Sequence, residues 1–290
     1  MNGKNINYYL IDGDVSGRVK CTFSNWTGVA YRIPRTEIEK CYNRDDLNRS
    51  GVYMLFGIDD QTGKDVVYIG QAGTRGVLNR LQDHKRNEDE NYWSEAIVFT
   101  SSNNFLGQTD ICYLENRLYN LAVSAKRYDA KNDNIPPQGN LTEEKKSELD
   151  DFIEYVKLMV GILGHKVFEP YVERPNIDQG LQVSETTEEI LCYSTRGGDF
   201  EGKGQQTPDG FVVFRGSRLK PELSDSCPHS ARAARERYSA VINEYMLTED
   251  VLLSSPSCAA SFLSGISVNG KDVWVNDDGD SLNTIERRGQ

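Results

Sequence analysis

Five side chains between residues 53 and 115 have the types and order that metal-dependent hydrolysis of a phosphodiester would use. Glu115 offers a carboxylate to a hard cation such as Mg²⁺, whose remaining positions water and phosphate can fill. Arg80 offers a phosphate a planar, permanently charged donor fork. Tyr53 and Tyr68 could orient or deprotonate a water, although a tyrosine base needs its pKa lowered by the metal and Arg80. His84 could act as the base or bind the phosphate.

These side chains fall on elements that hydrophobic patterning predicts. Two short runs rich in β-branched and aromatic residues, split by a polar turn at Gly63, predict a β-hairpin that carries both tyrosines. Apolar residues at helical spacing follow, with Arg80 and His84 as i,i+4 neighbours on the polar face. The predicted order is strand, strand, helix, strand, helix, over residues 51–57, 65–70, 75–86, 96–100 and 109–122.

The ordered set Gly-Val-Tyr, Tyr-Ile-Gly, Arg-x-x-x-His and a glutamate on a later helix resembles the GIY-YIG nuclease superfamily over roughly residues 51–136. Val52 replaces the isoleucine of the first motif. The resemblance implies a β-β-α-β-α core with a small mixed sheet. It also implies catalytic roles and a metal, Mg²⁺ or Mn²⁺, bound by the glutamate. The catalytic positions carried over are Tyr53, Tyr68, Arg80, His84 and Glu115.

Substrate contacts are expected beside these positions. Lys85 and Arg86 add positive charge next to His84 and suit an edge that binds the nucleic-acid backbone. Many members of the superfamily have a functional asparagine after the glutamate helix, which makes Asn132 and Asn134 candidates by resemblance. Their spacing does not choose between them, and an asparagine-rich turn before Pro136 is an equal alternative.

The expected function is that of a metal-dependent endonuclease, a phosphodiesterase acting on DNA, with RNA as a second substrate class, in repair, restriction or mobile-element biology. The alternative is a catalytically silent module on the same fold that binds nucleic acid or protein. The net charge of −11 opposes strong nucleic-acid binding. Most of the excess lies in residues 137–209, where 15 acidic residues face 7 basic ones. That segment is a candidate site for a protein partner, or an inhibitory mimic of DNA.

The chain is expected to be α+β, with a β-rich N-terminal extension at 1–50, the nuclease-like domain at 51–136, a helical and acidic connector at 137–209 and an accessory domain at 210–290. The extension reads as a hairpin packed beside the core, or as a nucleic-acid contact surface. The run Asn140-Leu141-Thr142-Glu143 is expected to form a helix N-cap with an acid at the third helical position. The helix that follows carries an apolar stripe, for which a neighbouring domain is the first expected partner and a dimer the second. A Gly-rich loop is expected at 197–204.

The last third is predicted to contain strands at 210–217 and 251–253, helices at 230–243 and 256–264, and a hairpin at Asn269-Gly270. Its motifs Phe-x-Val…Arg-Gly-Ser, Ser-Ser-Pro-Ser-x-Ala-Ala and Asn-Gly-x-x-x-Trp resemble DUF4357, a domain of unknown function that carries no known chemistry. The serines at 254, 255 and 257 lack an adjacent His-Asp partner in the sequence, so we expect them to cap a helix.

Composition indicates an ordinary globular protein, with 38% hydrophobic and 27% charged residues. No apolar run approaches the ~18–20 residues of a membrane span, and the first residues lack the apolar stretch of a signal peptide. The cytoplasm is therefore the expected compartment. The six cysteines are scattered without a Cys-x-x-Cys pair, and only three histidines are present. Free thiols are expected in place of a zinc site or disulfides.

Overall fold

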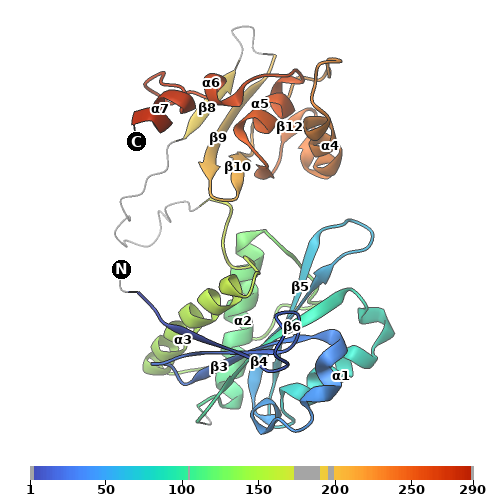
Figure 1. Cartoon of the computed structure of the whole chain (residues 1–290), viewed down its shortest axis with the longest axis vertical. Helices are drawn as coiled ribbons and strands as arrows, with labels where there is room; N and C mark the ends of the chain where they lie inside the picture. Colours follow the sequence, from blue (N-terminus) through green and yellow to red (C-terminus); the bar gives the residue numbers. More distant parts are fainter. Residues whose placement is uncertain (1–2, 104, 173–189, 195–198, 289–290) are drawn as a thin grey trace. The chain divides into compact units, whose positions relative to one another are not determined.

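A computed structural model describes residues 3–103, 105–172, 190–194 and 199–288. The chain divides into two compact units, unit 1 (Met1–Pro170) and unit 2 (Tyr171–Gln290) (Figure 1). Both contain helices and strands, which confirms the α+β class. All six cysteines are free thiols, as expected. Within the described ranges, none of the helices combines the length and apolar character needed to cross a membrane.

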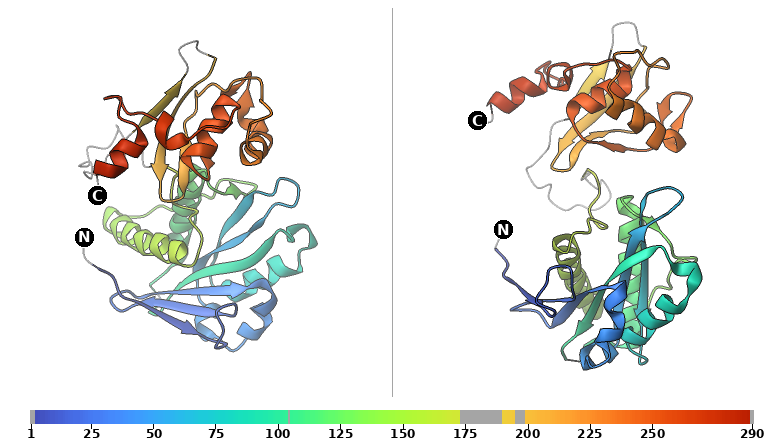
Figure 2. Two further views of the ribbon diagram at one scale, coloured as in Figure 1. Left: turned by 45° about the horizontal axis from the view of Figure 1, so that its top comes forward. Right: turned by 45° about the vertical axis from the view of Figure 1, so that its right-hand side comes forward.

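Unit 1 is built on a seven-stranded sheet with the strand order β1-β2-β3-β6-β4-β5-β7. Neighbouring strands are antiparallel except β7, which lies parallel to β5. The N-terminal strands, dark blue in Figure 2, continue the same sheet, so the segment expected as a separate extension at 1–50 lies inside unit 1. The strands are β1 (Ile6–Leu10), β2 (Val19–Phe23), β3 (Gly28–Pro34), β4 (Gly51–Ile58), β5 (Asp65–Ala72), β6 (Trp93–Ser101) and β7 (Asp129–Ala130).

Helices cover both faces of this sheet. One face packs against α2 (Gln108–Ala125) and α3 (Glu143–Ile162), through a core that includes Val52 and Met54 of β4. The other face, which carries Tyr53 and Leu55, packs against α1 (Val77–Arg86) and two short 3₁₀ helices. The 3₁₀ helices are η1 (Arg35–Cys41) and η2 (Asp45–Asn48), and a third, η3 (Glu88–Glu90), follows α1. Successive side chains of a strand point to opposite faces of the sheet, so neighbouring residues of β4 lie in different cores.

The apolar stripe of α3 packs inside unit 1. The helix begins at Glu143, and its cap is Thr142 in place of the expected Asn140, with the Thr142 side chain accepting a hydrogen bond from the Lys145 N–H. Leu149, Phe152 and Val156 are buried in the same core as the sheet. The stripe therefore packs on the 51–136 segment, the neighbouring part of the chain that was its first expected partner, and both segments belong to unit 1.

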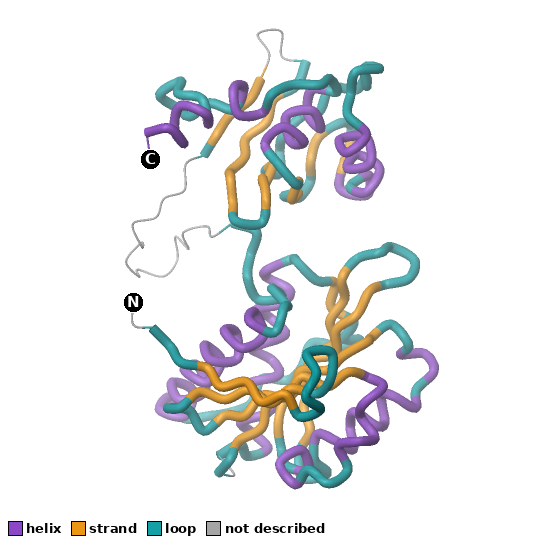
Figure 3. Tube along the Cα trace, viewed as in Figure 1, coloured by secondary structure: helices purple, strands orange, loops and turns teal. Residues whose placement is uncertain are grey.

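Unit 2 combines a four-stranded antiparallel sheet, ordered β13-β10-β9-β8, with a two-stranded β11-β12 ribbon. Figure 3 shows the helices and strands of this unit. Helix α5 packs on the sheet through buried residues that include Phe262 and Leu263, and Trp274 completes this core. The strands are β8 (Leu191–Ser194), β9 (Glu201–Thr207), β10 (Gly210–Val213), β11 (Ile242–Asn243), β12 (Met246–Leu247) and β13 (Val251–Leu253). The helices are α4 (His229–Arg237), η4 (Ser239–Val241), α5 (Pro256–Ser264), α6 (Gly270–Val273) and α7 (Leu282–Arg288).

Two expectations for unit 2 were wrong, and glycine packing explains both. The expected Gly-rich loop is a strand from residue 201 onward, because a Cβ at Gly202 would lie 2.1 Å from the Leu263 side chain. Residues 195–198 of that segment are outside the described ranges. At the expected hairpin, Asn269 instead caps α6, and a Cβ at Gly270 would lie 2.1 Å from the Pro256 backbone. In both places glycine permits close packing and does not form a turn.

Other expectations for unit 2 hold in whole or in part. Helix α5 begins with Pro256 and ends at Gly265, as its sequence predicts. The Ser255 side chain accepts a hydrogen bond from the Cys258 N–H, which confirms its capping role. The helix expected over 230–243 is shorter, because α4 ends at Arg237 and gives way to η4 and β11.

Candidate active site

The β4–β5 hairpin places the two candidate tyrosines on one face of the sheet. Tyr53 lies opposite Gly70, and Tyr68 lies two residues before Gly70 on the same strand, so their side chains point the same way. The ring centroids are 6.3 Å apart and the ring planes differ by 28°. A Cβ at residue 70 would lie 2.5 Å from the Tyr53 phenol oxygen. Glycine at this position therefore makes room for the Tyr53 ring across the strand.

Helix α1 brings Arg80 and His84 to the tyrosines. Its apolar residues, including Val77 and Leu81, are buried against the sheet, and the i,i+4 spacing carries the two polar side chains along one side. The Tyr53 oxygen and His84 Nε2 are 2.7 Å apart. The Tyr68 and His84 ring centroids are 4.9 Å apart. The histidine is buried, with 6% of its surface exposed.

Glu115 reaches this group from α2, whose apolar residues pack on the other face of the sheet. Its carboxylate accepts a hydrogen bond from the backbone N–H of Gln71 in β5. Burial raises the Glu115 pKa from its ordinary 4.5 to about 7, although the Gln71 hydrogen bond and the charge of Arg80 both act to lower it. The Gln71 hydrogen bond and the charge of Arg80 therefore do not fully offset the cost of burying the Glu115 charge.

The electrostatics of the tyrosines also reflect burial. Burial raises the pKa of Tyr53 and of Tyr68 above the ordinary value, and the charge of Glu115 adds to both shifts. Arg80 opposes the rise at both tyrosines and offers a hydrogen bond to Tyr53. The lowered pKa that a tyrosine base needs is therefore absent from the protein alone. Both phenols are neutral at pH 7.

The structure separates the two asparagine candidates. Asn132 Oδ1 accepts a hydrogen bond from the Ile69 N–H at 3.1 Å, and its Nδ2 donates to the Ile69 carbonyl at 2.7 Å. This amide extends the pairing of β5 beyond β7 and fixes the strand between Tyr68 and Gly70. Asn134 is exposed, two residues farther along.

The two side chains expected to bind the nucleic-acid backbone, Lys85 and Arg86, differ in pairing and exposure. Lys85 is bound through its Nζ to the carboxylate of Glu39. Arg86 is exposed at the end of α1. Arg86 is therefore the more accessible cation of the pair.

Sequence reasoning missed Glu90, whose carboxylate lies against His84. Glu90 Oε2 contacts His84 Nδ1, and Glu90 Oε1 accepts a hydrogen bond of 3.0 Å from Asn87 Nδ2. In the sequence this residue ends the acidic run 88–90, which is typical of a solvated turn. The only local signal is Asn87, whose side chain caps η3.

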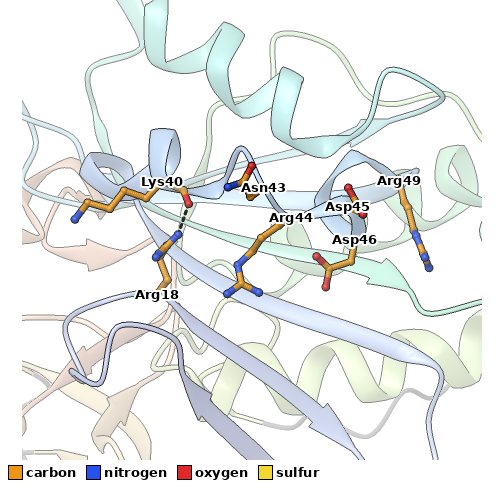
Figure 4. A pocket seen from close by; sticks show the side chains of 7 residues that line it. All are labelled: Arg18, Lys40, Asn43, Arg44, Asp45, Asp46 and Arg49. Atoms are coloured by element: carbon orange, nitrogen blue, oxygen red, sulfur yellow. Dashed lines mark hydrogen bonds between the residues drawn. The ribbon is translucent and has the colours of Figure 1, made fainter.

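A separate open hollow of about 500 Å³ lies beside η1 and η2 of unit 1 (Figure 4). Its charges are partly compensated, since Arg18 pairs with Asp12 at 2.6 Å and Asp46 pairs with Lys20 at 3.2 Å. Such a surface could attract an anion weakly. The hollow is lined by Arg18, Lys40, Asn43, Arg44, Asp45, Asp46 and Arg49.

Comparison with known families identifies the C-terminal part of the chain. Residues 192–286 match the family described as Domain of unknown function (DUF4357). The match confirms the expected C-terminal domain and begins before the expected boundary at 210. It lies within unit 2, so it carries no information about the tyrosine cluster. No curated protein and no solved structure matches the chain.

Proposed function

We propose that unit 1 hydrolyses phosphodiester bonds in a metal-dependent reaction, as an endonuclease of the GIY-YIG type. DNA is the proposed substrate, with RNA as the second class. The observation that carries this proposal is the convergence of five side chains from four elements. β4 and β5 supply Tyr53 and Tyr68, α1 supplies Arg80 and His84, and α2 supplies Glu115. The sequence order of these residues resembles that superfamily, and their grouping supports the resemblance.

The donor set fits Mg²⁺ or Mn²⁺ bound together with substrate. The described part of the chain contains no cluster of three or more His, Cys, Asp or Glu side chains arranged to hold a metal ion. Mg²⁺ does not require such a cage, since it keeps several waters and binds through one or two carboxylates and substrate phosphates. Burial raises the pKa of Glu115 although Arg80 acts to lower it, so a bound cation would add the positive charge that favours the ionised carboxylate. When bound, the cation would supply Lewis-acid stabilisation of the phosphate oxygens.

The remaining groups offer a path for the proton of the attacking water. Tyr68 is partly exposed, whereas Tyr53 lies behind it with 0% exposure and contacts His84. We infer that a proton taken up at the tyrosine pair passes from the Tyr53 hydroxyl to His84 Nε2. The hydroxide forms the new bond to phosphorus and the bond to the leaving oxygen breaks. That oxygen then takes up the proton, which returns from His84 through the tyrosine pair, so a neutral alcohol leaves and His84 is neutral again. Arg80 would stabilise the transient phenolate and bind a phosphate oxygen.

The burial of Tyr53 favours one alternative. A phenol with no exposed surface cannot touch substrate directly, so the cluster could equally be a packed remnant in a silent nucleic-acid-binding module. The two functions differ in what Glu115 does. In the enzyme its carboxylate is required for turnover, and in the silent module it is not required for binding.

The deciding experiment measures cleavage of single- and double-stranded DNA and RNA with Mg²⁺, with Mn²⁺ and with EDTA. The wild type is compared with Glu115→Gln and with Glu154→Gln, a control at an exposed glutamate of α3. Metal-dependent cutting that is lost in Glu115→Gln and kept in Glu154→Gln supports the proposal. Equal nucleic-acid binding by all three proteins, with no cutting by any, supports the silent module.

Partner and compartment are also proposed. We retain the cytoplasm as the proposed compartment and the acidic 137–209 segment or unit 2 as the surface for a protein partner. Residues 173–189 and 195–198 of that segment lie outside the described ranges. Its first part contains the whole of α3, whose apolar side belongs to the core of unit 1. Only the polar side of α3 is therefore available to a partner or to an inhibitory contact.

A further inference from the structure

His84 is held between two partners, one at each ring nitrogen. Its Nε2 lies 2.7 Å from the Tyr53 oxygen, and its Nδ1 contacts Glu90 Oε2. A carboxylate accepts hydrogen bonds and cannot donate them when ionised. The proton of a neutral His84 is therefore favoured on Nδ1, which leaves Nε2 as the acceptor for the Tyr53 hydroxyl.

The turn that carries Glu90 is fixed by an arginine from a distant part of unit 1. Arg35 Nη1 donates to the carbonyls of Glu90 at 2.8 Å and Trp93 at 3.3 Å. Its Nη2 donates to Asn91 Oδ1 at 2.8 Å and to the Lys85 carbonyl at 3.3 Å. The guanidinium also lies over the Trp93 ring, 4.5 Å from its centroid. One side chain thus ties the end of α1 to the start of β6 and holds the turn between them.

The Glu90 carboxylate is itself oriented within this turn. Asn87 Nδ2 holds Glu90 Oε1, and Asn87 Oδ1 accepts a hydrogen bond from the Asp89 N–H at 3.2 Å. The other oxygen of Glu90 is thereby directed at His84. A carboxylate placed only for solubility would not need both of its oxygens bound to side chains.

We propose that Glu90 is a positioning residue, which holds His84 as the Nδ1–H tautomer so that Nε2 can take the proton of Tyr53. This role rests on the proposed hydrolytic function. In the proton transfer, the Tyr53 O–H bond breaks and an Nε2–H bond forms. The resulting imidazolium carries one positive charge beside the negative charge of Glu90. The logic is that of a base oriented by a carboxylate, as in hydrolytic triads.

The test reads the tautomer of His84 directly, in the full-length chain without substrate. Nitrogen-15 chemical shifts of the imidazole distinguish protonated from unprotonated nitrogens, and His84→Gln identifies the His84 signals among the three histidines. The wild type is expected to show a protonated Nδ1 and an unprotonated Nε2. In Glu90→Leu the protonated population should move to Nε2. Glu90→Gln should retain the wild-type tautomer, because its amide oxygen can still accept from Nδ1.

Cleavage rates of the same proteins supply the second measurement. Glu90→Leu should lose at least about tenfold in rate, within the range attributed to general acid–base groups. Glu90→Gln should be intermediate, because it orients His84 without stabilising the imidazolium. Glu88→Leu is the matched control, an exposed acid in the same turn, and should leave both tautomer and rate unchanged.

The outcomes separate this inference from the proposed function. A wild-type His84 protonated on Nε2 overturns the positioning role, even if the protein cuts DNA. An unchanged tautomer in Glu90→Leu overturns it as well. The expected tautomers without cleavage by any variant would keep the positioning role of Glu90 and refute the hydrolytic function. If Glu90→Leu does not fold, the tautomer of His84 in the wild type still tests the positioning role of Glu90.

Discussion

Replacing Glu115 by glutamine should stabilise unit 1 at pH 8 and have little effect at pH 5. The substitution keeps the shape of the side chain and removes its charge from a partly buried site. In the wild type the carboxyl group has a pKa of about 7 in the folded chain against an ordinary 4.5. The folded state therefore prefers the protonated form. Its contribution to stability is complete below pH ~4.5 and is lost as the pH rises through about 7.

The size of the effect follows from that pKa. A shift from 4.5 to about 7 sets an upper limit of roughly 3 kcal/mol, at 1.36 kcal/mol for each pH unit. Because the side chain is partly exposed, solvent screening reduces this figure, and we expect about 1–2 kcal/mol. The free energy of unfolding of the wild type should fall by that amount relative to Glu115→Gln between pH 5 and pH 8.

Urea unfolding followed by tryptophan fluorescence measures the difference. Trp26 and Trp93 lie in unit 1, and a Trp274→Phe background removes the signal of unit 2. Mg²⁺ at pH 8 should stabilise the wild type and leave Glu115→Gln unchanged, since a bound ligand stabilises by mass action. If the free energies of unfolding of the wild type and Glu115→Gln differ by the same amount at pH 5 and pH 8, the argument that burial raises the Glu115 pKa is refuted. Equal stabilisation of both proteins by Mg²⁺ would refute Glu115 as the metal ligand.

Two further substitutions test how β5 is built. Gly70→Ala should displace the Tyr53 ring, destabilise unit 1 by about 1–3 kcal/mol and abolish cleavage, because the added Cβ would lie 2.5 Å from the phenol oxygen. Gly3→Ala, with no atom within 4 Å of its Cβ, is the control, and equal melting of both variants would contradict the packing argument. Asn132→Ala should cost about 1–3 kcal/mol in urea unfolding through its two lost backbone hydrogen bonds. The free energy of unfolding of Asn134→Ala should stay within about 0.5 kcal/mol of the wild type. A larger loss of stability in Asn134→Ala than in Asn132→Ala would contradict the assigned asparagine contacts.

The strands and helices around the candidate site could be predicted because their signals are local. The runs at 51–57 and 65–70 are rich in β-branched and aromatic residues, and the turn between them contains Gly63, which adopts a φ of +66°. Helix α1 has its apolar residues at helical spacing. Strand β3 was missed, because Gly28–Pro34 is buried almost throughout in the middle of the sheet and shows no alternation of polar and apolar residues.

The residues that the sequence did not indicate act through long-range contacts. Glu90 looks like one acid among three in a polar turn, and its contact with His84 depends on Arg35, which lies more than 50 positions earlier. Gly202 and Gly270 read as turn residues, whereas the structure uses them for close packing against a helix. Periodicity reports which face of an element is buried. It does not report which distant side chain lies opposite.

The position of the site at one edge of the sheet explains how helices from both faces contribute to it. Helices α1 and α2 pack on opposite faces, so their side chains can meet only where the sheet ends. β7 pairs with β5 only at Val66 and Val67, which leaves the rest of that edge open. Asn132 and Glu115 bind the backbone of β5 farther along, and through this contact Glu115 reaches the face that carries the tyrosines.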